Sequence, residues 1–600
     1  MSKPVPARAD CDPQYQWALT DIFPSDEAWQ AQYDRTMAAL DTLRGYEGHL
    51  ADSADTLLRY LRLGDELGQA LDALGNYAQR KSDEDTRVPA YQQMAAAFTN
   101  LAVAAAQADA FSTPELLAIP DETLDAFYDA APGLAHYRLL LTRIRRQRAH
   151  TLSREGEALL AAAGQMGQAP DDIFSMLNDA DMAFPDAIDS MGQAHPVTHS
   201  TFVPLLQSPD RALRENAFRA LYSVYGQFRN TSAAVLSAQM KQLQFFADAR
   251  RYDSALQAAL EANEVPTEIY HNLIAAVRRG LPAMHRYMRL RKRVLGVDEL
   301  HFYDLYTSIV PDQDFEIGYD EAKQLALDAL APLGPDYRAM LEEGFQGRWI
   351  DVYENQGKRS GAYSAGPYGT HPYVLLNYTG TLNDVFTLVH EMGHALHSYL
   401  SNKNQTATYA GYVIFVAEVA STCNESLLMQ HLLDKTADKR RRAYLIGYFL
   451  EQFRATLYRQ TMFAEFELWC SEQTQKGVPL TAELLSAKYQ ALNRDYYGPD
   501  VEPDPEIALE WARIPHLYYN FYVYQYATGY AAAIALSRRI LQEGAPAVQD
   551  YLDFLSKGCS ADPVTLLKGA GVDMACPAPV AQALELFSQL VGELEALLEA

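Results

Sequence analysis

Residues 381–394 read Thr381-Leu382-Asn383-Asp384-Val385-Phe386-Thr387-Leu388-Val389-His390-Glu391-Met392-Gly393-His394. They predict a single helix, because Thr381 can serve as its N-cap, Asp384 can complete a capping box, and no Gly or Pro interrupts the run before Gly393. Two histidines four residues apart project from nearly the same face of a helix. His390 and His394 can therefore reach one small cation, with Glu391 beside them, which is a geometry typical of zinc hydrolases.

The composition around this stretch is that of a large acidic globular protein. Of 600 residues, 48% are hydrophobic, which is enough for a substantial core and several subdomains. Asp and Glu outnumber Lys and Arg by 77 to 50, and a net charge of −27 disfavours binding to nucleic acid or to anionic membranes. We expect neither partner, and we interpret the basic run at residues 143–148 as a solvated helix face with ion pairs.

The cysteines and the N-terminus bear on the cellular compartment. The five cysteines are scattered and form no C-x-x-C pair, which indicates neither a disulfide framework nor a cysteine zinc site. The first ten residues are too polar and too rich in proline for a signal peptide, and no apolar run reaches membrane-spanning length. The sequence therefore predicts a cytoplasmic protein.

Helical periodicity dominates residues 13–170, where Leu and Ala recur at spacings of three and four. This rhythm lapses at residues 180–204, which favours a connector or a small hairpin, and then resumes. We predict two regions: residues 1–200 as a helical N-terminal region, and residues 201–600 as the catalytic region that carries the metal motif.

A convincing β signal lies just before the metal motif. Three strands are predicted, at residues 349–353, 360–364 and 373–378. The exposed edge of such a sheet can pair with the backbone of an extended peptide, so Ala362 and Tyr363 are predicted to bind substrate. The alternative is a hairpin that serves packing alone.

A catalytic zinc needs three protein ligands and one open position, so a third ligand must come from elsewhere. His397 is close in sequence, but three ligands on one helix would strain a tetrahedral site, and we expect it to pack or to support a ligand. A third histidine ten residues after His390 is excluded, because that position is Leu400.

Two carboxylates interrupt the next apolar helix, predicted over residues 412–425. Glu418 and Glu425 are seven residues apart and share a face of that helix. A desolvated carboxylate is costly unless it is paired or bound to metal. One of the two should bind the zinc directly and the other should hold a histidine N–H, and the residues alone allow either assignment.

A tyrosine-rich segment follows near the C-terminus. Residues 518–530 contain six tyrosines, and His516 precedes them. Core packing, with each hydroxyl bonded to the backbone, is one interpretation. The functional alternative is that phenol and imidazole donors face the metal and stabilise the oxyanion formed when water attacks a peptide carbonyl.

Residues 357–364, 390–398 and 415–422 closely resemble oligoendopeptidase F, a branch of the thimet-oligopeptidase family of zinc metallopeptidases, and the resemblance extends to residues 17–24. It implies that Glu418 is the third ligand of one Zn²⁺ per chain and that Glu425 is the supporting carboxylate. It also implies a mainly α fold, elongated, multi-helical and two-lobed around a deep channel, with one small β-sheet next to the metal-motif helix. Such a channel admits short unstructured peptides.

The resemblance also assigns the tyrosine-rich segment. His516, Tyr522 and Tyr526 would face the substrate, and Tyr526 is the best single candidate for stabilising the oxyanion. Tyr530 corresponds in order to the last substrate-facing tyrosine of the thimet branch, although one extra residue precedes Tyr522 and another follows Tyr526.

The sequence thus predicts a zinc-dependent endopeptidase that hydrolyses internal bonds of short oligopeptides with Glu391 as general base. One alternative is a carboxypeptidase-type exopeptidase, which needs a cationic group near the site. Another is a non-catalytic peptide-binding protein with a structural metal, which needs a fourth ligand such as His397 or Glu425. No oligomeric state is predicted.

Overall fold

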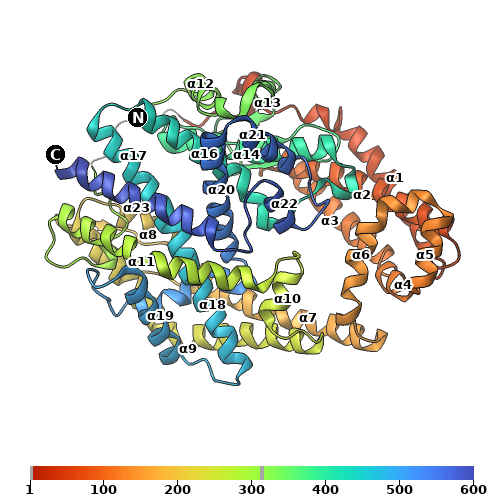
Figure 1. The fold of residues 1–600 in the computed structure, drawn as a ribbon, viewed down its shortest axis with the longest axis horizontal. Coiled ribbons are helices and arrows are strands. Elements are labelled where there is room, and N and C mark those ends of the chain that lie inside the picture. The colour runs from red at the N-terminus through yellow and green to blue at the C-terminus, as the bar shows by residue number, and fades with distance from the viewer. Residues whose placement is uncertain (1–3, 311–315, 600) are drawn as a thin grey trace.

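The computed structural model describes residues 4–310 and 316–599, and these are overwhelmingly helical, as predicted (Figure 1). The N-terminal helices are α1 (Asp26–Arg44), α2 (Ala54–Glu84), α3 (Pro89–Ala108), α4 (Ser112–Ala118), α5 (Asp121–Ala130), α6 (Arg138–Arg146) and α7 (Arg154–Ser175). Serine side chains cap three of them: Ser25 accepts from a backbone N–H of α1, and Ser53 and Ser153 do the same for α2 and α7.

The rest of the chain continues in helices. They are α8 (His199–Leu206), α9 (Arg211–Ala249), α10 (Ala255–Glu261), α11 (Thr267–Leu295), α12 (Tyr319–Ala329), α13 (Gly334–Gln346), α14 (Leu382–Asn404), α15 (Ala407–Ala410), α16 (Ile414–Lys435), α17 (Lys439–Gln452), α18 (Arg459–Gln475), α19 (Ala482–Tyr497), α20 (Tyr524–Glu543), α21 (Ala545–Leu555), α22 (Pro563–Gly569) and α23 (Ala578–Glu599).

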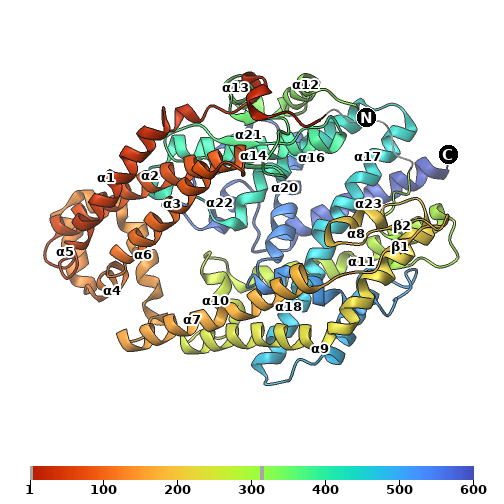
Figure 2. The same cartoon turned by 180° about the vertical axis from the view of Figure 1, so that it is seen from behind.

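The two views agree on an elongated, two-layered body (Figures 1 and 2). One layer holds α14 and α16 with α12, α13 and the N-terminal helices α1 to α3, and the other holds α9, α11, α18 and α19. Helix α20 runs between the layers and packs against both α16 and α18. The predicted mainly α, two-lobed fold is confirmed.

The small sheet before the metal motif is confirmed, with shorter strands than predicted. Its order is β3 (Ile350–Asp351), β5 (Tyr373–Leu375), β4 (Tyr363–Ala365), with β3 parallel and β4 antiparallel to β5. Just after β3, the Val352 N–H donates to the Tyr15 carbonyl at 2.9 Å, and the Val352 carbonyl accepts the Tyr378 N–H at 2.9 Å. The predicted connector contains a second sheet. It is a small antiparallel hairpin of two strands with two residues each, β1 (Ala187–Ile188) and β2 (Ala194–His195).

The metal-motif helix α14 begins as its sequence predicts. The Thr381 hydroxyl accepts the Asp384 N–H at 3.2 Å, and the Asp384 carboxylate accepts the Thr381 N–H at 3.0 Å. This reciprocal capping box satisfies two N–H groups that the first turn would otherwise leave free. The helix then continues through Gly393 to Asn404, so His390 and His394 lie on one unbroken element.

Close helix packing brings three distant stretches together. A Cβ added to Gly393 of α14 would lie 2.6 Å from the Ser421 Cα, so glycine lets α14 and α16 approach at backbone distance. Helix α20 also packs closely on α16, because a Cβ added to Gly529 of α20 would lie 3.6 Å from the Glu418 Cβ. The two histidines, Glu418 and the tyrosine-rich segment therefore meet around α16.

Two hydrophobic cores lie on either side of strand β5. Tyr373 and Leu375 join the core of the N-terminal helices, and Val374 and Leu376 join the core of the remaining helices. This alternation follows the two-residue period of a strand. Apart from Tyr373 and Leu375, the buried residues of the first core end at Leu141 along the chain, and those of the second begin at Phe174. The domain boundary near residue 200 stays a prediction.

Other expectations concern cysteines, charges and hydropathy. All five cysteines are free thiols. The basic run is paired as predicted, with Arg143 and Arg146 against Glu264, and Arg145 and Arg148 against Asp121. Across residues 4–310 and 316–599, no helix combines the length and the apolar character needed to cross a membrane.

Candidate active site

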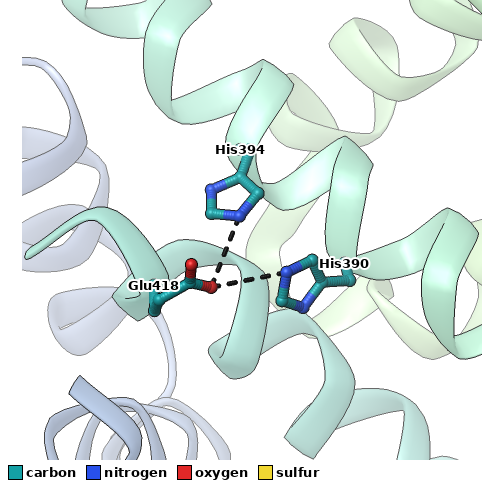
Figure 3. Close-up of side chains that lie close together, drawn as sticks. All are labelled: His390, His394 and Glu418. Carbon is teal, nitrogen blue, oxygen red and sulfur yellow. Dashed lines mark ion pairs between the residues drawn. The ribbon is translucent and has the colours of Figure 1, made fainter. Parts of the chain in front are cut away.

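His390, His394 and Glu418 converge on one point (Figure 3). The Glu418 Oε2 lies 3.4 Å from the His390 Nε2 and 3.4 Å from the His394 Nε2. Helix α14 supplies both imidazoles one turn apart, and α16 supplies the carboxylate from the facing side.

The spacing of these atoms suits a tetrahedral zinc site. Two ligands about 2.0–2.1 Å from a zinc ion at the tetrahedral angle lie about 3.4 Å apart. The three donor atoms lie within 4.8 Å of one another, and their side chains retain 18–34% of their exposure. The donor set of two imidazoles and one carboxylate is one that catalytic zinc sites use.

Electrostatics couple the cluster tightly. Burial lowers the pKa of His390, but hydrogen bonds to Glu418 and Glu425 outweigh it and raise that pKa to about 10. Burial would raise the pKa of Glu418, whereas its contacts with the two imidazoles hold it well below the usual range. The carboxylates thus favour positive charge at this point, which a divalent cation can supply in place of protons.

The two rival ligands do not reach the cluster. Glu425 Oε1 accepts the His390 Nδ1–H at 2.9 Å, the contact of a carboxylate that orients a histidine. His397 is 1% exposed and stacks on Tyr412 with ring centroids 3.8 Å apart. Among the described residues, three donors therefore face one another, which leaves room for an open fourth position.

Glu391 is a buried carboxylate beside the cluster. It is 6% exposed, and its Oε2 has no hydrogen-bond partner in the described part of the chain. Burial raises its pKa, and the neighbouring His390 and His394 lower it in part. An unpaired, poorly solvated carboxylate is a good proton acceptor.

The tyrosine-rich segment forms an aromatic cluster near Glu418. His516 lies in the short helix Pro515–Tyr518, and its Nε2 is 3.4 Å from the Tyr526 hydroxyl. The ring of Tyr522 stacks on His516 at 6.2 Å and meets Tyr526 edge-on at 5.3 Å. Burial raises the pKa of Tyr526, and the Glu418 charge adds to the shift, so Tyr526 keeps its proton near the Glu418 carboxylate.

Burial lowers the pKa of His516, and the charge of Arg459 lowers it further. His516 is therefore a neutral imidazole at pH 7, with one N–H to donate.

Three further residues predicted to contact substrate, Tyr530, Tyr363 and Ala362, lie outside the aromatic cluster. Tyr530 is 4% exposed, and its buried hydroxyl, which feels the Glu425 charge, has no hydrogen-bond partner within residues 4–310 and 316–599. The Tyr363 side chain turns into the N-terminal core, where its hydroxyl donates to Asp83 at 2.5 Å and accepts from Arg80 at 3.1 Å. Ala362 is half-buried just before the edge strand β4. Their contacts with substrate stay predictions.

Ser421 supports the cluster and was not predicted. Its hydroxyl lies 3.1 Å from the Glu418 Oε2 and 3.0 Å from the Glu418 carbonyl oxygen. Because a hydroxyl holds one hydrogen, it bonds one of these two oxygens at a time. The signal in the sequence is its position three residues after Glu418, on the same face of the helix.

Comparison with known proteins agrees with this geometry. The chain matches Peptidase family M3 over residues 204–586 and the Oligopeptidase F family over residues 115–184. The chain belongs to peptidase family M3.

Relatives of this M3 chain cover almost its whole length. Oligopeptidase PepF of Bacillus subtilis is 47% identical over 99% of this chain and 89% of its own. The crystal structure of oligoendopeptidase-F from Enterococcus faecium is 38% identical, with a TM-score of 0.75 over 96% of this chain and 99% of that one. A crystal structure from Chlamydophila abortus has a TM-score of 0.92 at 37% identity, over 99% of this chain and 100% of that one. The predicted family is confirmed, and the M3 chain is an oligopeptidase.

Proposed function

We propose that this protein is a zinc-dependent endopeptidase that hydrolyses internal peptide bonds of short oligopeptides. The observation that carries the proposal is the three-donor cluster with the buried, unpaired Glu391 beside it. A structural metal site would need a fourth protein donor, and among the described residues the cluster has three.

His390, His394 and Glu418 would hold the zinc ion. When bound, zinc acts as a Lewis acid that makes water and the scissile carbonyl more reactive at neutral pH. Glu425 keeps the His390 ring in place through its Nδ1–H, and Ser421 steadies the Glu418 carboxylate. These supporting contacts keep the donor atoms in register before a cation arrives.

Glu391 serves as the proton carrier. It accepts a proton from the attacking water and then delivers it to the nitrogen of the leaving amine. Its raised pKa suits both steps, because a weakly solvated carboxylate binds the proton readily and can still release it. No covalent intermediate with the enzyme is required.

His516 and Tyr526 supply hydrogen-bond donors to the oxyanion of the tetrahedral intermediate. Both keep their proton at neutral pH, because Tyr526 has a raised pKa and neutral His516 retains one N–H. Tyr522 and Tyr530 are proposed to contact the substrate. The free edge of β4, with Ala362 and Tyr363, is proposed to pair with the peptide backbone in a channel between the lobes.

The exopeptidase alternative needs a free cation near the site. Arg459 is close enough to His516 to lower its pKa, but its guanidinium pairs with the Glu510 carboxylate at 2.6 Å. A paired arginine is a poor anchor for a terminal carboxylate, which favours cleavage of internal bonds. We further propose a cytoplasmic enzyme that acts without nucleic acid or membrane partners, as the acidic composition favours.

The decisive variant is Glu391→Gln. We expect it to bind one zinc per chain and to keep its fold, while turnover of an internally quenched peptide blocked at both ends falls by about 10²–10⁴-fold. The matched control is Glu268→Gln at the exposed start of α11, which should turn over like the wild type. Full activity of Glu391→Gln would sink the assigned role.

Chelation tests the metal. We expect activity to be lost with a chelator and restored by added zinc. Blocked peptides separate the alternatives, because a carboxypeptidase would leave them intact. Activity that survives chelation would contradict the metal-dependent proposal.

A further inference from the structure

A strained turn connects His516 to the substrate-facing tyrosines. Asn520 and Phe521 both have positive φ, at 54° and 57°. The left-handed region is sterically unfavourable for a non-glycine residue. The other non-glycine residues with positive φ in the described chain stand singly, at Arg251, Glu264 and Arg348. Two consecutive residues in this region persist only if neighbouring structure holds them.

A buried carboxyl group holds this turn. Glu467 of α18 is 0% exposed, and its Oε1 accepts the Phe521 N–H at 2.7 Å. Its Oε2 is buried and has no partner among the described residues. The residues around it on α18 are mostly apolar and buried. A carboxyl group in such surroundings costs free energy unless it is hydrogen-bonded, and here its bond is to the Phe521 N–H.

Further buried contacts anchor the same segment. Phe521 is 1% exposed, and its ring meets the ring of Tyr270 edge-on at 5.8 Å. The Tyr270 hydroxyl donates to the Ala464 carbonyl on α18 at 2.7 Å. At the other end, the Gln239 side-chain amide donates to the Tyr518 carbonyl at 3.2 Å. Side chains from three helices, α9, α11 and α18, thus hold residues 518–521 in place.

We propose that Glu467 is a positioning residue, which acts through the Asn520–Phe521 turn to aim His516, Tyr522 and Tyr526 at the metal cluster. The inference rests on the proposed function of those three side chains. Tyr522 follows the turn directly, and α20, which carries Tyr526, begins two residues later. Without the carboxyl, the Phe521 N–H would be buried and unpaired, which is unfavourable, and the turn would relax to relieve its strain.

The principal test compares Glu467→Gln with Glu467→Met. Glutamine keeps an oxygen that can accept the Phe521 N–H, and methionine has similar size without one. We expect Glu467→Gln to stay within about threefold of wild-type kcat and Glu467→Met to lose about 10–100-fold, mainly in kcat and with zinc content unchanged. Hydrogen exchange at residues 517–526 should rise in Glu467→Met alone.

A second pair of variants strains the turn without touching the core. Asn520 is exposed, and valine there disfavours positive φ while glycine accepts it freely. We expect Asn520→Val to lower kcat as Glu467→Met does and Asn520→Gly to resemble the wild type. If thermal unfolding shows that Glu467→Met does not fold, Glu467→Gln and the Asn520 pair carry the test.

The outcomes separate this inference from the proposed function. Wild-type cleavage of the blocked peptide tests the function, whereas hydrogen exchange needs no substrate. The inference is overturned if exchange at residues 517–526 is unchanged in Glu467→Met, if exchange rises while kcat stays at the wild-type level, or if Glu467→Gln loses as much activity as Glu467→Met. It is also overturned if Asn520→Val matches Asn520→Gly.

Discussion

His397 lies one turn beyond the second predicted zinc ligand, yet its chemistry differs entirely from that of His394. It is 1% exposed, and burial lowers its pKa to about 3, so it is neutral at pH 7. Its ring stacks on Tyr412, in agreement with the packing role expected from the sequence. The sequence gives both histidines the same residue type, and only burial distinguishes them.

Because the pKa of His397 is lowered in the folded protein, the free energy of unfolding should depend on pH. Below the unfolded pKa of about 6.5, the unfolded chain gains a proton that folded His397 does not accept, so the free energy of unfolding falls by about 1.4 kcal/mol per pH unit. The contribution is fully present above pH 6.5 and is lost progressively as pH falls toward 3. His397→Phe keeps an aromatic ring against Tyr412 and removes this titration.

Denaturant unfolding of the metal-free protein at pH 7 and pH 5 measures the effect. The wild type should lose about 2 kcal/mol more than His397→Phe over this interval, as its lowered pKa requires. An equal loss in both proteins would contradict the prediction. Chelator in all samples removes the separate pH dependence of metal binding.

The choice between Glu418 and Glu425 is also decided at the residue scale. Both lie on one face of α16, so the residue spacing left them equivalent. In the structure, Glu418 faces the Nε2 atoms of both histidines, and Glu425 reaches the Nδ1 of one. Their separate positions along α16, relative to the histidines of α14, produce this difference, and no local pattern encodes it.

At the scale of elements, the packing of α14 on α16 depends on Gly393. Glycine inside a helix is unfavourable by about 1 kcal/mol relative to alanine, so its presence needs a reason. The reason is the 2.6 Å that would separate an added Cβ from the Ser421 Cα. The sequence shows the glycine, but the facing backbone is known only once the helices are packed.

Gly393→Ala should therefore push α14 away from α16 and separate the histidines from Glu418. We expect a loss of about 1–3 kcal/mol in stability from overpacking and at least a tenfold weaker zinc affinity. Thermal unfolding and zinc titration measure these effects.

The matched control is Gly64→Ala in α2, where an added Cβ meets no atom within 4 Å. That substitution should be neutral or stabilising by up to about 1 kcal/mol. Zinc affinity of Gly393→Ala equal to that of Gly64→Ala would contradict the packing argument.

At the scale of the whole molecule, β5 joins two hydrophobic cores. Leu375 packs into the core of the N-terminal helices, and its neighbour Val374 packs into the other. Both side chains are 0% exposed. A short strand thus transmits the position of the N-terminal lobe to the sheet that precedes the metal-motif helix.

Leu375→Ala and Val374→Ala should consequently loosen different lobes. We expect Leu375→Ala to cost about 2–5 kcal/mol and to raise hydrogen exchange chiefly in α1 and α2. Val374→Ala should raise exchange chiefly in α13 and α14. The same pattern of exchange in both variants would show that the two cores behave as one.

The sequence by itself determined the features that depend on residues a few positions apart. These are the capped helix with His390 and His394 on one face, the helical character of the chain and the small sheet before the motif. Caps and helix faces follow from local geometry, which every short stretch carries within itself.

Only the tertiary structure decided which side chains from distant elements meet. It brought Glu418 to both histidines, turned Tyr363 into the N-terminal core and set Glu467 against Phe521, 54 residues away. Such contacts depend on the relative positions of packed helices, which many side chains determine jointly. The spacing within one helix can place a group on a face, but the partner of that face is set by the fold.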